Sequence, residues 1–329
     1  MNRYEPPYEI TNLMLTYISD ISEKLGRIEA YRSLDTKPQL RKNNRIKSVH
    51  SSLKIESSSL SEGTVRAVLN DRDVIGPEKE IQEVKNAFAA YDRIGTVDPY
   101  SVTALKELHG VMTYLTVEES GTFRRGAEGV FDGDRCIFMA PPPKMVPYLT
   151  EQLFAWMKQS SKTVHPLILS CVFHYEFVFI HPFSDGNGRM ARLWQTILLT
   201  DWNPVFQYIP LESRIERFQD GYYDAIAACN ANGSSTVFIE FMLARISEVL
   251  DYVLIQSGRE AGFSEYVGKL LSVMEYDTAY PASALLERLG LRSKEALRHN
   301  YLDPAIEAGL VEMTIPDKPT SRNQRYQKK

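Results

Sequence analysis

The sequence predicts a mostly α-helical protein, and three observations lead to this class. Apolar residues recur at three- and four-residue spacings over most of the 329 residues, as on the buried face of a helix. Clusters of Gly, Pro and Asn separate these stretches. Strand-like patterns are confined to a short segment near residue 130 and two near the C-terminus. We therefore expect a helical core with a small β-hairpin, a helical region before it and a winged helix-turn-helix after it.

Residues 1–97 are predicted to form the helical N-terminal region. Apolar residues such as Leu13, Ile18 and Leu25 begin a helical pattern that runs from about residue 10 to residue 94, with Glu, Lys and Arg between them. Residues 98–256 are predicted to form the core. Its helices are expected at Ser101–Leu115, Val146–Gln159, Pro166–Ile180, Arg189–Thr200, Leu211–Ala228 and Ser235–Leu254.

A β-hairpin is predicted within this core, between Gly121 and Pro143. Two short apolar segments, residues 129–131 and 136–139, flank the sequence Asp132-Gly133-Asp134. A Gly between two Asp residues suits a tight turn that joins antiparallel strands.

Residues 258–329 are predicted to form the winged helix-turn-helix, because the helical pattern breaks at Gln256-Ser-Gly258. Three helices and two strands are expected in it, at Ser264–Met274, Pro281–Leu289, Ser293–Gly309, Val311–Ile315 and Asn323–Gln327. Basic residues slightly outnumber acidic ones here. Binding to DNA, binding to protein and support of the core all stay open for this part of the chain.

The overall composition argues against several classes of protein. A net charge of -4 provides no basic field for nucleic acid. Three scattered cysteines without C-x-x-C spacing argue against disulfides and structural zinc and fit a cytoplasmic protein. The longest apolar stretch, Leu167 to Ile180, is too short to span a membrane, and the N-terminus lacks the apolar segment of an export signal. We expect no membrane anchor.

The segment from residue 181 to residue 192 carries the clearest chemical signal. Gly186, Asn187 and Gly188 allow a turn with positive φ and a close approach of the backbone just before a helix begins. Backbone N–H groups at a helix start form an anion site, and Arg189 and Arg192 add two guanidinium groups. This arrangement suits a polyphosphate.

Two side chains in the same segment suit phosphate chemistry. Asp185 can hold Mg²⁺ against the phosphates, and His181 has the pKa range of a general base. The apolar stripe of the following helix, which includes Leu193 and Ile197, is expected to face the core and to leave the arginines on another face. A calcium loop is excluded, because Arg189 stands where an oxygen ligand is needed.

The sequence H-P-F-S-D-G-N-G-R-M-A-R at residues 181–192 resembles the signature H-x-F-x-[DE]-G-N-G-R-x-x-R of the Fic family at every specified position. The resemblance implies an AMP transferase that uses ATP and Mg²⁺ and attaches AMP to a hydroxyl side chain of a protein target, with self-modification also open. The implied roles are a base at His181, a metal ligand at Asp185, a phosphate cradle at Gly186, Asn187 and Gly188, and binding of the β/γ end by Arg189 and Arg192. Phe183 is implied to be structural.

The resemblance also implies roles for two further segments, the hairpin and residues 52–57. The hairpin resembles the flap that docks the target as an added strand, with Val130, Phe131, Ile137 and Phe138 as its docking residues. Upstream, Ser52-Leu-Lys-Ile-Glu56-Ser57 resembles the inhibitory motif [ST]-x-x-x-E-[GN] of one Fic class. The resemblance implies that Glu56 pairs with Arg192 and competes with the ATP γ-phosphate. Ser57 departs from this motif, and serine accepts the left-handed conformation less readily than Gly or Asn.

Alternative functions also remain. The same site can remove AMP from a modified target if Glu56 positions a water molecule. A nucleotide-sensing regulator can instead bind DNA through residues 293–309. Assembly into a homo-oligomer stays open, and His174 is expected to be a core histidine without a catalytic role.

Overall fold

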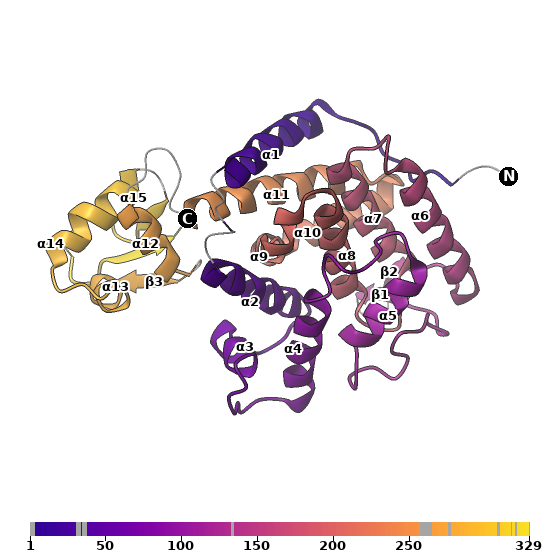
Figure 1. The fold of residues 1–329 in the computed structure, drawn as a ribbon, viewed down its shortest axis with the longest axis horizontal. Coiled ribbons are helices and arrows are strands. Elements are labelled where there is room, and N and C mark those ends of the chain that lie inside the picture. The colour runs from indigo at the N-terminus through magenta and orange to yellow at the C-terminus, as the bar shows by residue number, and fades with distance from the viewer. Residues whose placement is uncertain are drawn as a thin grey trace. The chain divides into compact units, whose positions relative to one another are not determined.

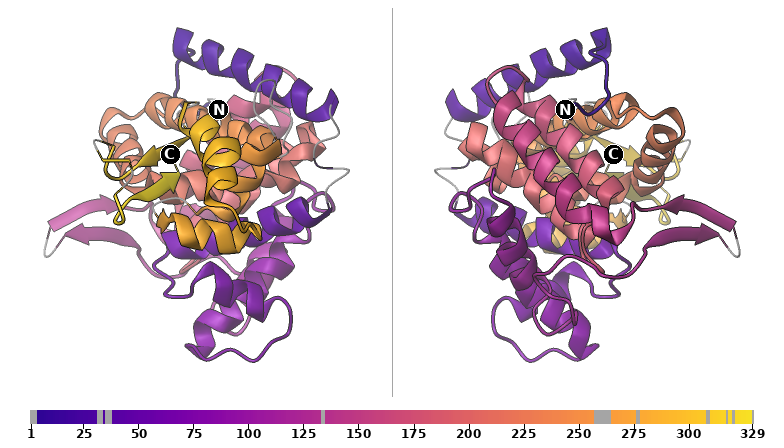
Figure 2. Two further views of the ribbon diagram at one scale, coloured as in Figure 1. Left: turned by 90° about the vertical axis from the view of Figure 1, so that its left-hand side faces the viewer. Right: turned by 90° about the vertical axis from the view of Figure 1, so that its right-hand side faces the viewer.

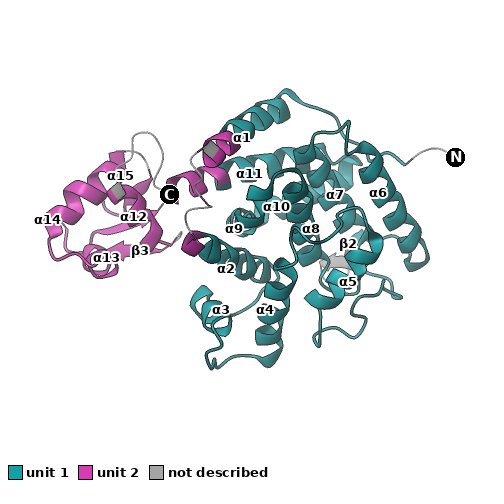
Figure 3. Ribbon diagram, viewed as in Figure 1, with its two compact units in different colours: residues 1–23, 41–249 teal, residues 24–40, 250–329 magenta. Residues whose placement is uncertain are grey.

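The computed structural model describes residues 4–30, 34, 38–132, 135–256, 265–275, 278–307, 310–316, 318–319 and 321–328. Helices dominate it (Figure 1), which confirms the predicted mostly α class. The chain groups into two compact units (Figure 3): residues 1–23 and 41–249 form unit 1, and residues 24–40 and 250–329 form unit 2. The predicted division into 1–97, 98–256 and 258–329 stays a prediction.

The described part of the N-terminal region contains α1 (Asn12–Ala30), α2 (Pro38–Ile55), α3 (Glu62–Val68) and α4 (Glu78–Tyr91). α2 buries small polar side chains beside its apolar ones, among them Ser48, Ser51 and Ser52. Hydrophobic spacing alone does not reveal such a face, because its buried positions are not apolar. This face of α2 contributes residues to the site described below.

Two successive helices, α7 (Pro166–Ile180) and α8 (Asn187–Trp202), pack against each other at the centre of unit 1 (Figure 1). α7 begins with Pro166, whose missing N–H costs nothing at the first position of a helix, and nearly all of its residues are buried. Leu193, Trp194 and Ile197 of α8 are buried as predicted. The loop of residues 181–186 therefore joins two helices that are fixed by the core.

The other helices of unit 1 follow the predicted order, with two differences in their bounds. They are α5 (Val102–Met112), η1 (Pro143–Met145), α6 (Val146–Ser160), η2 (Pro204–Tyr208), α9 (Glu212–Arg217), α10 (Gln219–Asn232) and α11 (Thr236–Gln256), whose end belongs to unit 2. The prediction of one helix over Leu211–Ala228 was wrong, because Phe218 leaves helical geometry with ψ of 38°. The helix predicted to reach Leu115 ends at Met112, and Leu115 adopts a φ of 59°.

The predicted hairpin consists of β1 (Gly129–Asp132) and β2 (Arg135–Met139), which pair antiparallel. Val130 lies opposite Phe138, and the register shifts between Val130 and Phe131. Figure 2 shows the two strands extending away from the helices of unit 1. The Phe138 ring lies 5.5 Å from the Phe179 ring of α7. The side chains of Val130, Phe131 and Ile137 lie outside the described part of the chain.

Unit 2 contains a three-stranded sheet of order β3-β5-β4 and a small helical core. Its elements are α12 (Glu265–Val273), β3 (Ala279–Pro281), α13 (Ala282–Leu289), α14 (Lys294–Ala296), the π-helical segment η3 (Leu297–Leu302), α15 (Asp303–Glu307), β4 (Val311–Met313) and β5 (Arg325–Lys328). Leu270, Leu285 and Leu297 are buried in its core. The sequence missed β3, because three residues are too few for an alternating pattern, and Pro281 ends that strand rather than beginning a helix.

Cys171 and Cys229 are buried free thiols. Among the described helices, none combines the length and the apolar character that crossing a bilayer requires.

Candidate active site

His181 ends α7 in the left-handed conformation, with φ of 51° and ψ of 61°. Its backbone N–H donates to the Phe177 carbonyl at 2.9 Å. The ring Nδ1 lies 3.3 Å from the Val178 carbonyl, an atom that only accepts, so Nδ1 carries the proton and Nε2 keeps a free lone pair. Burial lowers the pKa of His181 below its ordinary value. The imidazole is therefore neutral at pH 7 and can accept a proton.

The loop after His181 is held closed by one amide side chain. Asn187 Oδ1 accepts from the Phe183 N–H at 2.9 Å, and Asn187 Nδ2 donates to the Phe183 carbonyl at 2.7 Å. Phe183 itself is fully buried, as its implied structural role requires. Only the backbone of Asn187 is thus left for an anion, together with the other first-turn N–H groups of α8, which lack helical acceptors.

Arg189 lies between two carboxylates. Its side chain is 4% exposed, with Nη2 3.0 Å from Asp185 Oδ1 and Nη1 3.4 Å from Glu83 Oε1 on α4. Its Nε is buried and has no hydrogen-bond partner among the described residues. Asp185 is more open, with 46% of its side chain exposed. The arginines were expected on a face of α8 other than the apolar stripe; Arg189 is nonetheless buried, with Glu83 of α4 against it.

Arg192 and Glu56 form the ion pair that the inhibitory motif implies. Arg192 Nη2 lies 2.7 Å from Glu56 Oε1, and Arg192 is 1% exposed. The same guanidinium donates to the Ser52 carbonyl at 3.0 Å and to the Ser52 hydroxyl at 3.3 Å. A Cβ atom on Gly188 would collide with Glu56 Oε1, so a side chain at this position would have to push the carboxylate aside. The Glu56 carboxylate therefore fills the space above the first turn of α8.

The chain after Glu56 turns sharply and is fastened to α4. Ser57 adopts a φ of 68°, the left-handed conformation that glycine or asparagine takes more easily. The Ser58 hydroxyl and the Ser59 N–H both donate to Glu80 Oε2 at 2.7 Å. The hydrogen bond from Ser58 is the main reason why the pKa of Glu80 is lowered. Glu80 thus holds the strained turn that carries Glu56.

His109 of α5 supports the other end of the loop. Its Nδ1 accepts from the Gly121 N–H at 2.9 Å, so the proton is on Nε2, which donates to the Asp185 carbonyl at 3.0 Å. The ring stacks on Phe183 with centroids 3.6 Å apart. Burial lowers the pKa of His109 to about 4, so the ring stays neutral and keeps this tautomer.

Sequence reasoning missed His109, Glu80 and Glu83, because no local motif marks them. His109 falls on an apolar helix face, and the two glutamates look like ordinary exposed residues of α4. His174 was correctly expected to be a core residue: it is fully buried between Gln195 at 2.6 Å and Tyr222 at 2.9 Å.

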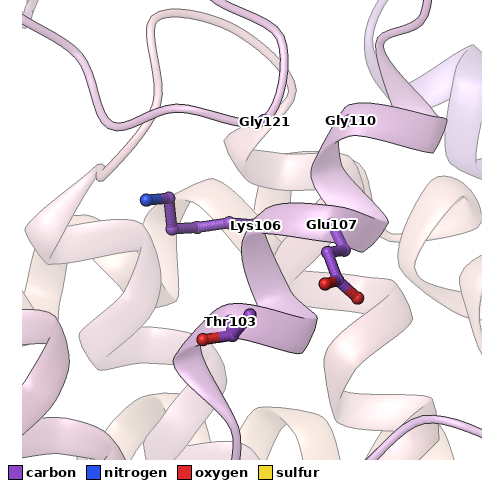
Figure 4. Close-up of a pocket in the computed structure, with 5 residues that line it drawn as sticks. All are labelled: Thr103, Lys106, Glu107, Gly110 and Gly121. Atoms are coloured by element: carbon purple, nitrogen blue, oxygen red, sulfur yellow. The ribbon is translucent and has the colours of Figure 1, made fainter.

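A groove of about 340 Å³ lies beside α5 (Figure 4). Its lining residues are Thr103, Lys106, Glu107, Gly110 and Gly121. No residue of the 181–192 loop lines it. The groove is open and lacks a buried charged side chain, so we locate the candidate site at the loop itself, where Glu56 fills the space over α8.

Two segments of the chain match known protein families. Residues 99–199 match the Fic/DOC family, and residues 265–328 match the C-terminal domain described as Filamentation induced by cAMP protein Fic-like. A crystal structure of a Fic family protein from Desulfovibrio desulfuricans G20 is 37% identical, with a TM-score of 0.74 over 99% of this chain and 98% of that one.

Curated relatives match at lower identity. Protein adenylyltransferase Fic of Drosophila melanogaster is 27% identical over 262 residues, which cover 73% of this chain and 49% of the relative. The Drosophila erecta protein of the same name is 26% identical over 310 residues, covering 87% of this chain and 59% of the relative. The chain thus spans about half the length of the curated relatives it matches.

Proposed function

The chain belongs to the Fic family, and on that premise we propose that it transfers AMP from ATP to a hydroxyl side chain of a protein target. One observation carries the proposal: a neutral histidine, a helix start and two buried arginines meet at a single loop. Curated relatives bear the name protein adenylyltransferase. Once Glu56 leaves, a phosphate chain laid along this loop meets the positive end of α8 and the guanidinium groups of Arg189 and Arg192.

The reaction follows from these groups. His181 Nε2 takes the proton of the target hydroxyl, whose oxygen forms a bond to the α-phosphorus of ATP. The bond between the α-phosphorus and the bridging oxygen to the β-phosphate breaks, and pyrophosphate leaves with the electron pair. Arg189, Arg192 and the first N–H groups of α8 bind the β- and γ-phosphates and neutralise the charge that develops on them. The loop therefore supplies a base and a cradle for the leaving group.

Asp185 is the residue that would hold Mg²⁺. Its carboxylate is nearly half exposed beside the cradle, and among the described residues no cluster of three metal-ligating side chains exists. Magnesium commonly binds one or two carboxylates together with substrate phosphates and water, which fits a single protein ligand here. When bound, it supplies charge neutralisation at the phosphates. Arg189 Nη2 donates a hydrogen bond to Asp185 Oδ1, which keeps the carboxylate oriented toward α8.

Glu56 restrains this reaction in our proposal. Its carboxylate takes the guanidinium of Arg192 and the space over Gly188, both of which the end of the phosphate chain needs. Two negative groups cannot share that space, so productive ATP binding requires Glu56 to leave. Ser52 supports the restraint by accepting two hydrogen bonds from the same guanidinium. The hairpin would receive the target as an added strand along one edge.

A labelling experiment tests the transfer. Wild type, Glu56→Gly and Glu56→Gly/His181→Ala are incubated with Mg²⁺, a protein lysate and ATP labelled at the α-phosphate or, separately, at the γ-phosphate. We expect label on protein only from the α-phosphate, with strong labelling by the single variant, weak labelling by wild type and the least labelling by the double variant. Intact-mass analysis of the chain itself reports self-modification. Label from the γ-phosphate would indicate a kinase instead, and no label with any variant would contradict the proposal.

The rate of transfer should fall in acid. The base must be neutral, so activity is lost as pH drops through the pKa of His181. Since burial lowers that pKa from its ordinary value of about 6.5, we expect the half-maximal rate of Glu56→Gly below pH 6.5 and a constant rate between about pH 7 and 8. Rates measured from pH 5 to 8 at saturating ATP check this. A midpoint above pH 7 would argue against His181 as the base.

Glu80 is expected to strengthen the restraint. Glu80→Ala removes the acceptor that holds Ser58 and Ser59, so the strained turn loosens and Glu56 leaves Arg192 more often. Transfer in otherwise wild-type protein should rise roughly 2- to 10-fold, the effect of one or two ordinary hydrogen bonds. Glu78→Ala, two residues earlier on the exposed start of α4, is the matched control. Equal rates for the two variants would contradict the role of Glu80.

A further inference from the structure

We propose that Arg124 is a positioning residue for the transfer reaction, because its side chain ties the backbone of His181 to both ends of the β-hairpin. Arg124 is 2% exposed. Its Nε donates to the His181 carbonyl at 2.6 Å, Nη1 to the Gly126 carbonyl at 2.8 Å and Nη2 to the Pro141 carbonyl at 2.6 Å. Its effect on catalysis rests on the proposed function, whereas its effect on His181 does not.

Arginine suits this position for a geometric reason. Gly126 lies three residues before β1 and Pro141 two residues after β2, so both bases of the hairpin meet at one guanidinium. Nη2 also lies 3.4 Å from the Ile180 carbonyl. The last carbonyls of a helix have no partner within it, and a cation at that end is favourable. A planar guanidinium offers five donors spread over three nitrogens, whereas a lysine ammonium offers three donors on one nitrogen and cannot reach four separated carbonyls.

The left-handed backbone of His181 explains why this support matters. A non-glycine residue in that conformation is strained and persists only where its surroundings hold it. The carbonyl of His181 is held by Arg124, and the next carbonyl, that of Pro182, accepts from the Arg124 N–H at 2.9 Å. Two hydrogen bonds from one residue thus orient the two successive peptide groups that follow the base. The direction of the imidazole depends on the first of these peptide groups, which contains the carbonyl of His181 itself.

The segment that carries Arg124 is itself anchored on α5. Figure 4 shows Gly121 beside Gly110, and a Cβ on Gly110 would lie 3.6 Å from Gly121 Cα, in van der Waals contact. Gly121 has a φ of 74° and donates to His109. His109 in turn holds Asp185, so residues 121–126 support both ends of the catalytic loop. The hairpin and the loop are therefore mechanically connected through Arg124.

Charge adds a second effect of the same residue. Three charged groups act on His181: Glu128 from the hairpin base, Arg124, and Glu56 from the end of α2. Apart from burial, which is the largest influence, Arg124 lowers the pKa of His181, and the two glutamates raise it. Removal of the Arg124 charge should therefore raise that pKa and move the acid limb of the rate profile to higher pH.

The experiment compares Arg124→Gln and Arg124→Lys in the Glu56→Gly background. The neighbouring Arg125→Gln is the matched control, because 88% of the Arg125 side chain is exposed. We expect Arg124→Gln to lower kcat roughly 10- to 100-fold, as expected for a misplaced reacting group, with the ATP Kd within about 2-fold of the parent. NMR titration of the His181 ring should show its midpoint at higher pH. Arg124→Lys should lose kcat without that shift, since the charge remains.

The proposal is overturned if Arg124→Gln has the same kcat as Arg125→Gln, or if the titration of His181 does not change. Equal loss of ATP binding and kcat in both Arg124 variants would also overturn it, because it indicates a general structural role. If Glu56→Gly transfers no AMP, the proposed function fails. The His181 titration and the amide exchange across the hairpin still decide whether Arg124 positions His181 and the hairpin.

Discussion

Replacing His181 with alanine is expected to lower the rate of AMP transfer about 10²- to 10⁴-fold relative to the Glu56→Gly parent, the usual contribution of a positioned general base. The reason is local. Nδ1 is committed to the Val178 carbonyl, so Nε2 is the nitrogen that can take the proton, and burial keeps the ring neutral at pH 7. Alanine removes that acceptor. Single-turnover rates of Glu56→Gly and Glu56→Gly/His181→Ala with excess enzyme measure the chemical step directly.

Binding of ATP separates this effect from a damaged fold. The arginines and the first turn of α8 hold the phosphates in our proposal, so the double variant should keep the ATP Kd of its parent within about 3-fold. His181→Asn is a second variant that accepts the left-handed conformation well and lacks the base. It should be as slow as His181→Ala. Transfer at the parental rate by either variant would remove His181 from the mechanism.

The elements of the fold could be predicted where hydrophobic spacing and helix-start residues within the segment determine the structure. α7 begins at its proline, and α8 begins two residues earlier than predicted because the turn at residue 186 already starts the helix. Patterns fail where tertiary contacts decide. Phe218 breaks a stretch that reads as one helix, and β3 exists through its pairing with β5 across more than forty residues. Neither feature has a sequence signal within its own segment.

The candidate site likewise contains residues that a local motif reveals and residues that only tertiary contacts bring to it. The clustering of residues 181–192 could be predicted because one short loop contains the histidine, the carboxylate and both arginines. Their burial could not be predicted, since it comes from α2 and α4, more than a hundred residues earlier. Arg124 carries no signal at all: its acceptors are backbone carbonyls, and any residue type can supply those. A motif can therefore predict the residues of the catalytic loop, whereas the residues that position this loop are visible only in the folded structure.

Replacing Glu56 with glycine is expected to raise the rate of transfer roughly 10- to 100-fold, the effect of removing one charge-assisted hydrogen bond that competes with the substrate. Arg192 Nη2 lies 2.7 Å from Glu56 Oε1, and the same oxygen covers Gly188, so the variant frees a guanidinium and a helix start together. The ATP Kd, measured by calorimetry with Mg²⁺, should tighten in parallel, because both gains act on the phosphates.

Ser57→Gly is the matched control for this variant, because it also introduces glycine at the end of α2 but leaves the carboxylate in place. Ser57 already holds a φ of 68°, where glycine is favoured, so this change should relieve strain and keep Glu56 on Arg192. We expect the transfer rate of Ser57→Gly at or below that of wild type. If Ser57→Gly activates as strongly as Glu56→Gly, flexibility of the helix end controls the enzyme and the carboxylate does not. If only Glu56→Gly activates, competition for Arg192 is the restraint.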